Sequence, residues 1–288
     1  MAADANILKN MILIYSGKGV GATSLKQTKC TFSKIFRDHN YQIRTINLKQ
    51  LLNSSWESRC ALLIMPGGAD VPYDRALRGK GNAKILNYVK QGGRYLGICA
   101  GAYYGTSQVI WNAGKKDQII EDRELKFFKG SAIGPAFKNP PYSYTDESSA
   151  RIARLTLKNN DQAITYYNGG CLFKFEQKNK SKIKKEISIL AKYRDLKGQP
   201  AAIILSKIEK GKAVLCGPHP EFDPSLMNNK DPHLKKIIKK LHSDQSRFAI
   251  LELIFNSLDL SRVNFKKLSE TNTQPKPKKI NGRGAKSH

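Results

Sequence analysis

The residue best placed to do covalent chemistry in this sequence is Cys99. It lies at the centre of residues 97–101 (Gly-Ile-Cys-Ala-Gly), after an apolar run and before a helix-compatible segment. A nucleophile at such a strand-to-helix junction lies on a sharp turn, and the two flanking glycines leave room for its backbone. The amide groups of the new helix would point at the sulfur, which lowers the pKa of a thiol. The pattern predicts a nucleophilic cysteine; the alternative is a buried structural cysteine in a glycine-rich turn.

A thiol nucleophile needs a base, and residues 217–221 (Gly-Pro-His-Pro-Glu) offer one directly after an apolar run that ends at Cys216. The two prolines would hold this loop rigid. Glu221 lies two residues beyond His219, where its carboxylate could orient the imidazole. We therefore predict that His219 and Glu221 complete a Cys-His-Glu triad with Cys99. The alternative is a loop histidine beside an incidental glutamate.

Residues 66–68 (Pro-Gly-Gly) end another apolar run. We predict that the backbone amides of Gly67 and Gly68, together with that of Ala100, donate hydrogen bonds to the oxyanion that forms when a thiolate attacks a carbonyl. The alternative is an ordinary Pro-Gly turn. The predicted site residues all follow strand-like runs, and open α/β sheets bind their ligands at the carboxyl ends of strands.

Cysteine and histidine spacing argues against a metal site or a disulfide framework. The five cysteines are scattered without a CxxC pair, and none of the five histidines has metal-ligand spacing. Residues 17–24 resemble a phosphate-binding loop, but Ala22 precedes Thr23 where a Walker-type loop needs lysine. No metal and no cofactor are therefore predicted.

The chain is strongly basic, with 50 Lys and Arg against 23 Asp and Glu and a net charge of +27. Such a field attracts polyanions at low salt, but no nucleic-acid-reading motif accompanies it, which argues against nucleic acid as the main partner. No run approaches the roughly 20 apolar residues of a membrane span, so no membrane partner is predicted. Residues 1–10 lack a secretion-signal pattern. We expect a cytoplasmic protein, although a chain whose signal peptide had been removed would look the same.

The elements that would position these residues are those of an α/β fold. Residues 11–15, 61–65 and 95–98 are short apolar runs separated by helix-compatible segments, which is typical of parallel strands covered on both faces. We predict a doubly wound, flavodoxin-like, mostly parallel sheet. Strand-like segments with little helix between them are expected to add antiparallel or mixed strands, at residues 151–157, 163–167, 171–175, 187–193, 201–208 and 213–216.

One domain is predicted over residues 1–260, closed by a helix at about 245–258. Residues 261–288 hold eight Lys and Arg, one Glu and few apolar side chains. A segment of that composition cannot bury enough apolar surface to offset its ordering entropy. We predict a disordered basic tail there.

The motifs together resemble those of the class I glutamine amidotransferase-like superfamily. They are most similar to the domain at the N-terminus of eukaryotic biotin-protein ligases, which is also known as a stand-alone bacterial protein. The resemblance covers residues 11–258. Its motifs are residues 15–17 (Tyr-Ser-Gly), 66–73 (Pro-Gly-Gly-Ala-Asp-Val-Pro-Tyr), 79–82 (Gly-Lys-Gly-Asn), 97–105 (Gly-Ile-Cys-Ala-Gly-Ala-Tyr-Tyr-Gly) and 166–170 (Tyr-Tyr-Asn-Gly-Gly), together with the His-Pro-Glu of the triad.

The resemblance implies a Cys-His-Glu hydrolase that acts on an amide or related C–N bond. Asp70, Tyr73, Tyr103 and Tyr104 are then expected to bind a small-molecule or peptide ligand around Cys99. Glutamine-using relatives carry glutamine four residues after the nucleophile, where this chain has Tyr103. Glutamine is therefore not expected as the substrate, and the substrate and the oligomeric state are not predicted.

Two other functions remain open at this point. The chain could be a catalytically silent regulatory module, related to biotin-protein ligases, that uses the same pocket to bind a small molecule or peptide. It could also be a basic adaptor for polyanions, an interpretation that rests on charge alone. The biotin ligase catalytic domain, which would bind biotin and ATP, is not expected on this chain.

Overall fold

A computed structural model of the chain describes residues 9–176, 186–241 and 244–260. Its centre is a set of five parallel strands in the order β2-β1-β3-β4-β13, which is the order of flavodoxin-like sheets. These strands are β1 (Met11–Tyr15), β2 (Gln42–Ile46), β3 (Cys60–Met65), β4 (Arg94–Ile98) and β13 (Gly211–Cys216). Because parallel neighbours end at the same edge, the segments that follow β3, β4 and β13 come together there.

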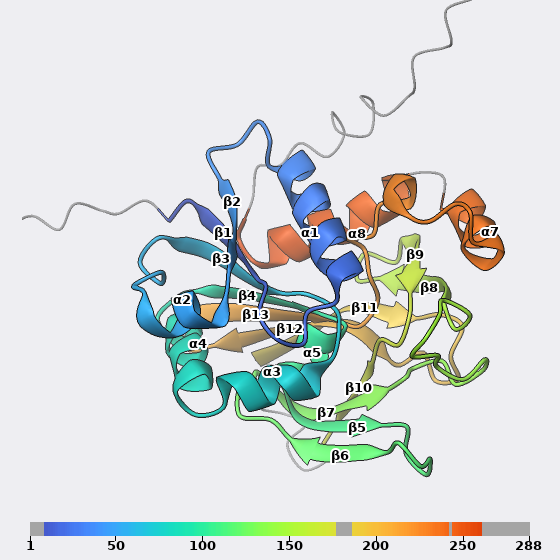
Figure 1. The fold of residues 1–288 in the computed structure, drawn as a ribbon, viewed down its shortest axis with the longest axis horizontal. Helices are drawn as coiled ribbons and strands as arrows, with labels where there is room; N and C mark the ends of the chain where they lie inside the picture. Colours follow the sequence, from blue (N-terminus) through green and yellow to red (C-terminus); the bar gives the residue numbers. More distant parts are fainter. Residues whose placement is uncertain (1–8, 177–185, 242–243, 261–288) are drawn as a thin grey trace, which may run out of the picture.

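Helices cover both faces of this parallel core (Figure 1). On one face lie α1 (Ala22–Ile35) and α8 (Asp244–Ser257). On the other lie α2 (Leu48–Asn53), α3 (Asp70–Leu77) and α4 (Lys80–Lys90). The doubly wound arrangement predicted from the apolar runs is therefore confirmed.

Successive side chains of β1 pack into different cores. In β1, Ile12 and Ile14 are buried in the cluster that contains Phe32 of α1, whereas Leu13 is buried in the cluster that contains Val89 of α4. Full burial of one such side chain stabilises the fold by about 1.5–3 kcal/mol. An unbroken apolar run forms a strand here because both of its faces are covered.

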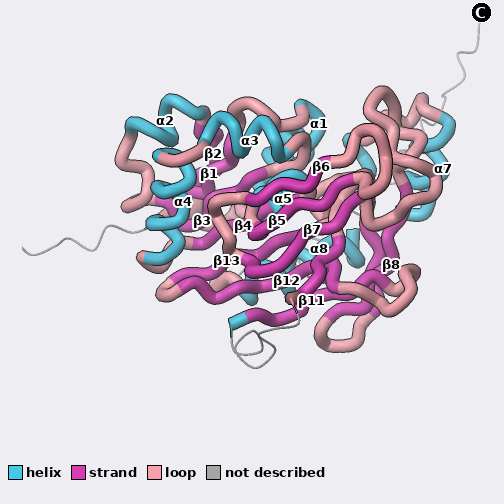
Figure 2. Tube along the Cα trace, turned by 90° about the horizontal axis from the view of Figure 1, so that it is seen from below, coloured by secondary structure: helices cyan, strands magenta, loops and turns pink. Residues whose placement is uncertain are grey.

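Beyond β13 the sheet becomes mixed, and Figure 2 shows these strands continuing past the parallel core. Along the main path, β12 and β10 add antiparallel pairs, β7 pairs in parallel with β5, and β6 forms the edge. A side branch runs from β12 through β11 and β8 to β9. The added strands are β5 (Thr106–Trp111), β6 (Ile119–Asp122), β7 (Phe128–Gly134), β8 (Arg151–Leu157), β9 (Gln162–Tyr167), β10 (Leu172–Phe175), β11 (Ile187–Tyr193) and β12 (Ala201–Ile208).

The predicted antiparallel and mixed strands after residue 150 are all present, whereas β5, β6, β7 and helix α7 (Pro232–Lys240) lie where no element is predicted. β5 and β6 are largely exposed or half-buried, and their sequences show neither a continuous apolar run nor clean alternation. α7 begins at Pro232 behind an Asp231 side chain that caps its first turn, and it covers a third small core beside β8. The predicted tail, residues 261–288, lies outside the described residues. No helix in the described part of the chain is long and apolar enough to cross a membrane.

Candidate active site

Cys99 lies at the turn between β4 and helix α5 (Ala100–Tyr104), with φ 49° and ψ −104°. A positive φ is rare for residues other than glycine and is found at strained functional turns. The two flanking glycines make this turn possible. A Cβ atom on Gly97 would lie 2.2 Å from the carbonyl oxygen of Gly101, and a Cβ atom on Gly101 would lie 2.0 Å from that of Met65. The strand-to-helix turn predicted from the sequence is therefore present.

The loop after β13 brings the predicted base to the same place. β13 pairs in parallel with β4, with Cys216 opposite Ile98, so the residues that follow each strand share one edge. His219 and Cys99 line one cavity and are 4% and 7% exposed. The Nδ1 atom of His219 lies 2.8 Å from Oε1 of Glu221, which is fully buried.

The electrostatics of this group favour a charged imidazole. Burial lowers the pKa of His219, but the Glu221 carboxylate and the Cys99 sulfur raise it by more, partly through hydrogen bonds, so that it lies well above its usual value. Oε2 of Glu221 is buried without a hydrogen-bond partner among the described residues. The imidazolium is therefore the group that offsets the negative charge of Glu221.

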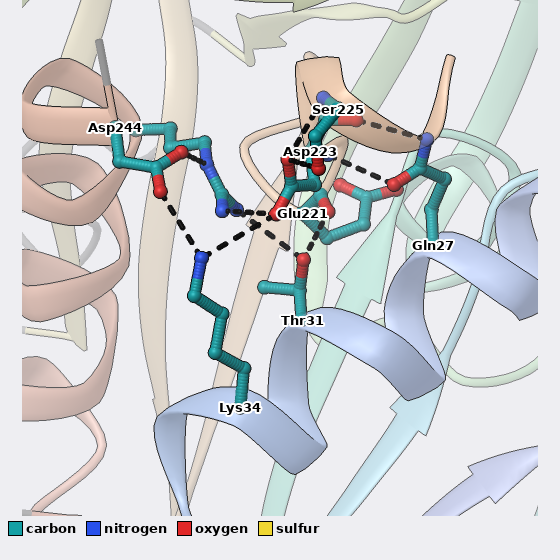
Figure 3. Close-up of polar contacts among 8 residues, drawn as sticks. Gln27, Thr31, Lys34, Glu221, Asp223, Ser225 and Asp244 are labelled. Atoms are coloured by element: carbon teal, nitrogen blue, oxygen red, sulfur yellow. Dashed lines mark hydrogen bonds and ion pairs between the residues drawn. The ribbon is translucent and has the colours of Figure 1, made fainter. Parts of the chain in front are cut away.

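A buried polar network holds the loop that carries Glu221 between α1 and α8 (Figure 3). Thr31 of α1 donates a hydrogen bond of 2.7 Å from its hydroxyl to the carbonyl oxygen of Glu221. Arg247 of α8 donates to the same hydroxyl at 3.2 Å and forms an ion pair of 2.9 Å with Asp223. Gln27 exchanges hydrogen bonds with the backbone of Asp223, and this network therefore fixes the position of the Glu221 backbone.

We expect Arg247→Met to lower the free energy of unfolding by about 2–3 kcal/mol, as measured by urea denaturation. Removing one partner of a buried ion pair typically costs about 3–5 kcal/mol because the other charge is left buried. The loss is smaller here because Lys34 stays within 3.6 Å of Asp223 and 3.2 Å of Asp244. Arg44→Met, at an exposed position of β2, is the matched control and should change stability by less than about 0.5 kcal/mol. Equal losses in the two variants would contradict a structural role for Arg247.

The predicted oxyanion donors fall into two groups. Gly68 and Ala100 line the cavity beside Cys99, and neither amide donates a hydrogen bond to another described residue. Gly67 does not line the cavity and instead lies beneath the imidazole, where an added Cβ atom would be 2.7 Å from Cε1 of His219. The geometry therefore leaves the Gly68 and Ala100 amides available to an oxyanion, whereas Gly67 makes room for the base.

The predicted substrate-binding residues are also divided. Asp70 and Tyr103 line the cavity, whose volume is about 350 Å³. Tyr73 is fully buried behind it and donates a hydrogen bond of 3.0 Å to the carbonyl oxygen of Pro66. Tyr104 is also fully buried and bonds to the side chain of Asn82. Successive residues of a helix point about 100° apart, so Tyr103 and Tyr104 cannot both face the cavity.

The two predicted substrate-binding side chains that do line the cavity, Asp70 and Tyr103, are held by buried partners. The Tyr103 hydroxyl donates a hydrogen bond of 3.0 Å to the carbonyl oxygen of Gly169. Asp70 accepts two hydrogen bonds, of 2.7 and 2.9 Å, from the fully buried Arg123. Burial raises the pKa of Asp70 above its usual value, although Arg123 opposes that rise.

Several lining residues were not predicted from the sequence. They come from β5, from the segment 135–150 and from the end of β9, and they are Trp111, Tyr142, Tyr144, Glu147, Tyr166 and Asn168. Tyr166 and Asn168 lie in a motif that carried the family resemblance, so that motif could have indicated them. The Cys99 sulfur lies 3.8 Å from the carbonyl oxygen of Asn168, which places this motif against the strand-to-helix turn at Cys99, hereafter the elbow.

The fold and the site together define an α/β protein with a cysteine at a strand-to-helix turn and a buried His-Glu pair beside it. The chain belongs to the family described as biotin-protein ligase, N terminal, whose model matches residues 10–280. The family resemblance predicted from the motifs is thus confirmed.

Two relatives agree with this placement. An uncharacterized protein of Chlamydia muridarum is 37% identical over 234 residues, which cover 80% of this chain and 88% of that protein. A biotin–protein ligase of Schizosaccharomyces pombe is 35% identical over 219 residues, which cover 73% of this chain but only 33% of that protein. Structures similar in fold include a glutamine amidotransferase (14% identity, TM-score 0.48, covering 80% of this chain and 97% of that one). They also include PurLQS from Thermotoga maritima (15% identity, TM-score 0.47, covering 85% and 100%).

Proposed function

We propose that the protein is a cysteine hydrolase that cleaves an amide or related C–N bond through a thioester. The observation that carries this proposal is the elbow: Cys99 has a positive φ at a strand-to-helix turn and shares a cavity with His219. The Nδ1 atom of His219 is hydrogen-bonded to the buried carboxylate of Glu221, which leaves Nε2 for the reaction. A nucleophile, a base and a group that orients the base are the parts that such a reaction needs.

In this proposal His219 already holds the thiol proton as an imidazolium, and the Cys99 thiolate attacks the carbonyl carbon. The amides of Gly68 and Ala100 hold the oxyanion. The C–N bond then breaks, the amine leaves with the proton from His219, and an acyl thioester remains on Cys99. Water, deprotonated by His219, then attacks the thioester and its C–S bond breaks. The acid is released, and the Cys99 thiolate again lies beside the His219 imidazolium.

A catalytically silent binding module is the second candidate, and one observation favours it. Tyr103, at the position where glutamine-using relatives carry glutamine, is 3% exposed and is bonded to a backbone carbonyl. It therefore narrows the cavity next to the nucleophile. The third candidate, a polyanion adaptor, rests on the net charge of +27 alone.

Selective alkylation separates the enzyme from the silent module. Cys30 is an exposed thiol in the same chain and serves as an internal control for Cys99. With iodoacetamide at pH 6.5, an activated Cys99 should react faster than Cys30, because only a cysteine paired with a cation is substantially thiolate at that pH. The modified residue is identified by peptide mass spectrometry. Alkylation of Cys30 with Cys99 left untouched would contradict the proposal.

A further inference from the structure

The wall of the cavity differs in charge from the rest of the protein. The chain carries 50 Lys and Arg residues, yet none is among the described residues that line the cavity. The ionisable lining groups other than the thiol and the tyrosine phenols are Asp70, Glu147 and His219. Apart from the His219 imidazolium, which is paired with Glu221, the described lining of the cavity therefore carries carboxylates and no cation.

Among these carboxylates, Glu147 is the one left without a cation. Asp70 is paired with Arg123, and His219 is paired with Glu221. Glu147 forms no ion pair within the described part of the chain. Its Oε2 atom instead accepts hydrogen bonds of 2.6 Å from the Tyr166 hydroxyl and 2.9 Å from the Asn168 side-chain amide. These donors orient the carboxylate and leave its negative charge uncompensated.

Three aromatic rings form a corner in the same cavity. Trp111 and Tyr142 have ring centroids 5.1 Å apart at 83°, and Tyr142 and Tyr144 have centroids 4.9 Å apart at 90°. The Trp111 indole donates a hydrogen bond of 2.8 Å to the Tyr144 hydroxyl, which donates one of 2.7 Å to Asp117. Both pairs meet edge to face, and the parts of the ring faces that no neighbouring edge covers carry the negative quadrupole that attracts an organic cation.

We infer that this cavity binds a ligand that carries an organic cation, held by the aromatic corner of Trp111, Tyr142 and Tyr144 and by the carboxylate of Glu147. For a substrate, this rests on the proposed function: the cation marks one end of the molecule, and the scissile carbonyl lies at the other end beside Cys99. An aromatic wall and an uncompensated carboxylate both favour positive charge and disfavour an anion. The free carboxylate of glutamine would meet no lysine or arginine among the described lining residues.

The inference can be tested by binding alone, with Cys99→Ala so that no covalent step occurs. The probes are benzyltrimethylammonium, benzyl alcohol and benzoate, which share a ring and differ in charge. Intrinsic fluorescence reports the site because the chain has two tryptophans, and Trp56 is buried against Tyr88, away from the cavity. Measurements at 0.15 M salt limit long-range effects of the net charge, since the Debye length is then about 8 Å.

We expect benzyltrimethylammonium to bind roughly tenfold more tightly than benzyl alcohol, with benzoate weaker than both. Glu147→Gln should weaken the binding of benzyltrimethylammonium by about tenfold and leave the affinity for benzyl alcohol unchanged. Glu252→Gln, which removes the same charge from an exposed position of α8, is the matched control and should change neither affinity. Tyr142→Leu provides a second variant with the Glu147 carboxylate intact. It should also weaken the binding of benzyltrimethylammonium more than that of benzyl alcohol.

Benzoate binding as tightly as the cation, or a cation affinity unchanged by both Glu147→Gln and Tyr142→Leu, would overturn the inference. Failure of the proposed function would look different. Cation binding together with an unreactive Cys99 in the wild type would leave the inference standing and remove the hydrolase. A reactive Cys99 in a protein whose cavity does not prefer the cation would support the hydrolase and overturn the inference.

Discussion

Replacing His219 by alanine should slow the alkylation of Cys99 by about 100-fold at pH 6.5. The imidazole is held in its charged form because Glu221 and the Cys99 sulfur raise its pKa well above the usual value. An imidazolium beside the sulfur stabilises the thiolate, which is the reactive form. A nearby opposite charge typically favours the charged form by about 10- to 1000-fold, so its loss should reduce the thiolate fraction by about 100-fold.

The pH profile makes this prediction specific. The rate for the His219→Ala variant should rise steeply with pH, because the thiolate then forms only by loss of its proton to solvent, whereas the wild-type rate should change little between pH 6.5 and 8. His233 offers a matched control, because it is a half-buried histidine bonded to the carbonyl oxygen of Ala150, away from the triad. His233→Ala should keep the wild-type profile. Identical profiles for the wild type and His219→Ala would show that the histidine does not activate the thiol.

The parallel core and the meeting of Cys99 with His219 were predictable because each rests on local patterns. An apolar run can form a strand covered on both faces, and parallel strands must end at one edge. These two facts place Cys99 and His219 close together although they are far apart in the sequence. The buried Glu221 beside His219 follows from a spacing of two residues within one loop.

The rest of the cavity depends on contacts that no local pattern encodes. Trp111 comes from a strand with no clean periodicity, and Tyr142 and Glu147 come from a segment without helix or strand. Their approach to Cys99 is set by how the mixed strands return to the parallel core. The contacts of Arg247 could not be predicted either, because one arginine in an apolar helix does not indicate that its side chain binds Asp223 and Thr31.

The direction in which Tyr104 points could not be predicted from the sequence either. Tyr103 and Tyr104 are adjacent in a motif, and the motif does not say which ring faces the ligand. In the structure the first reaches Gly169 across the cavity wall, and the second bonds to Asn82 inside the core. The rotation of α5 about its own axis decides between them, and that rotation follows from how the elbow packs.

Gly101→Ala should cost about 4 kcal/mol or more of the free energy of unfolding, enough to leave little folded protein. The added Cβ atom would lie 2.0 Å from the carbonyl oxygen of Met65, and both groups belong to backbone that cannot rotate away. The Gly101 amide also donates a hydrogen bond of 3.2 Å to Pro66, so any shift of α5 breaks that contact. Soluble yield and urea denaturation measure the effect.

Gly21→Ala is the matched control for this substitution. Gly21 has φ −71°, and its added Cβ atom would meet nothing closer than 3.6 Å. The Gly21→Ala substitution should therefore lower the free energy of unfolding by no more than about 1 kcal/mol. A Gly101→Ala protein as stable as Gly21→Ala would mean that β3 and α5 can separate at the elbow.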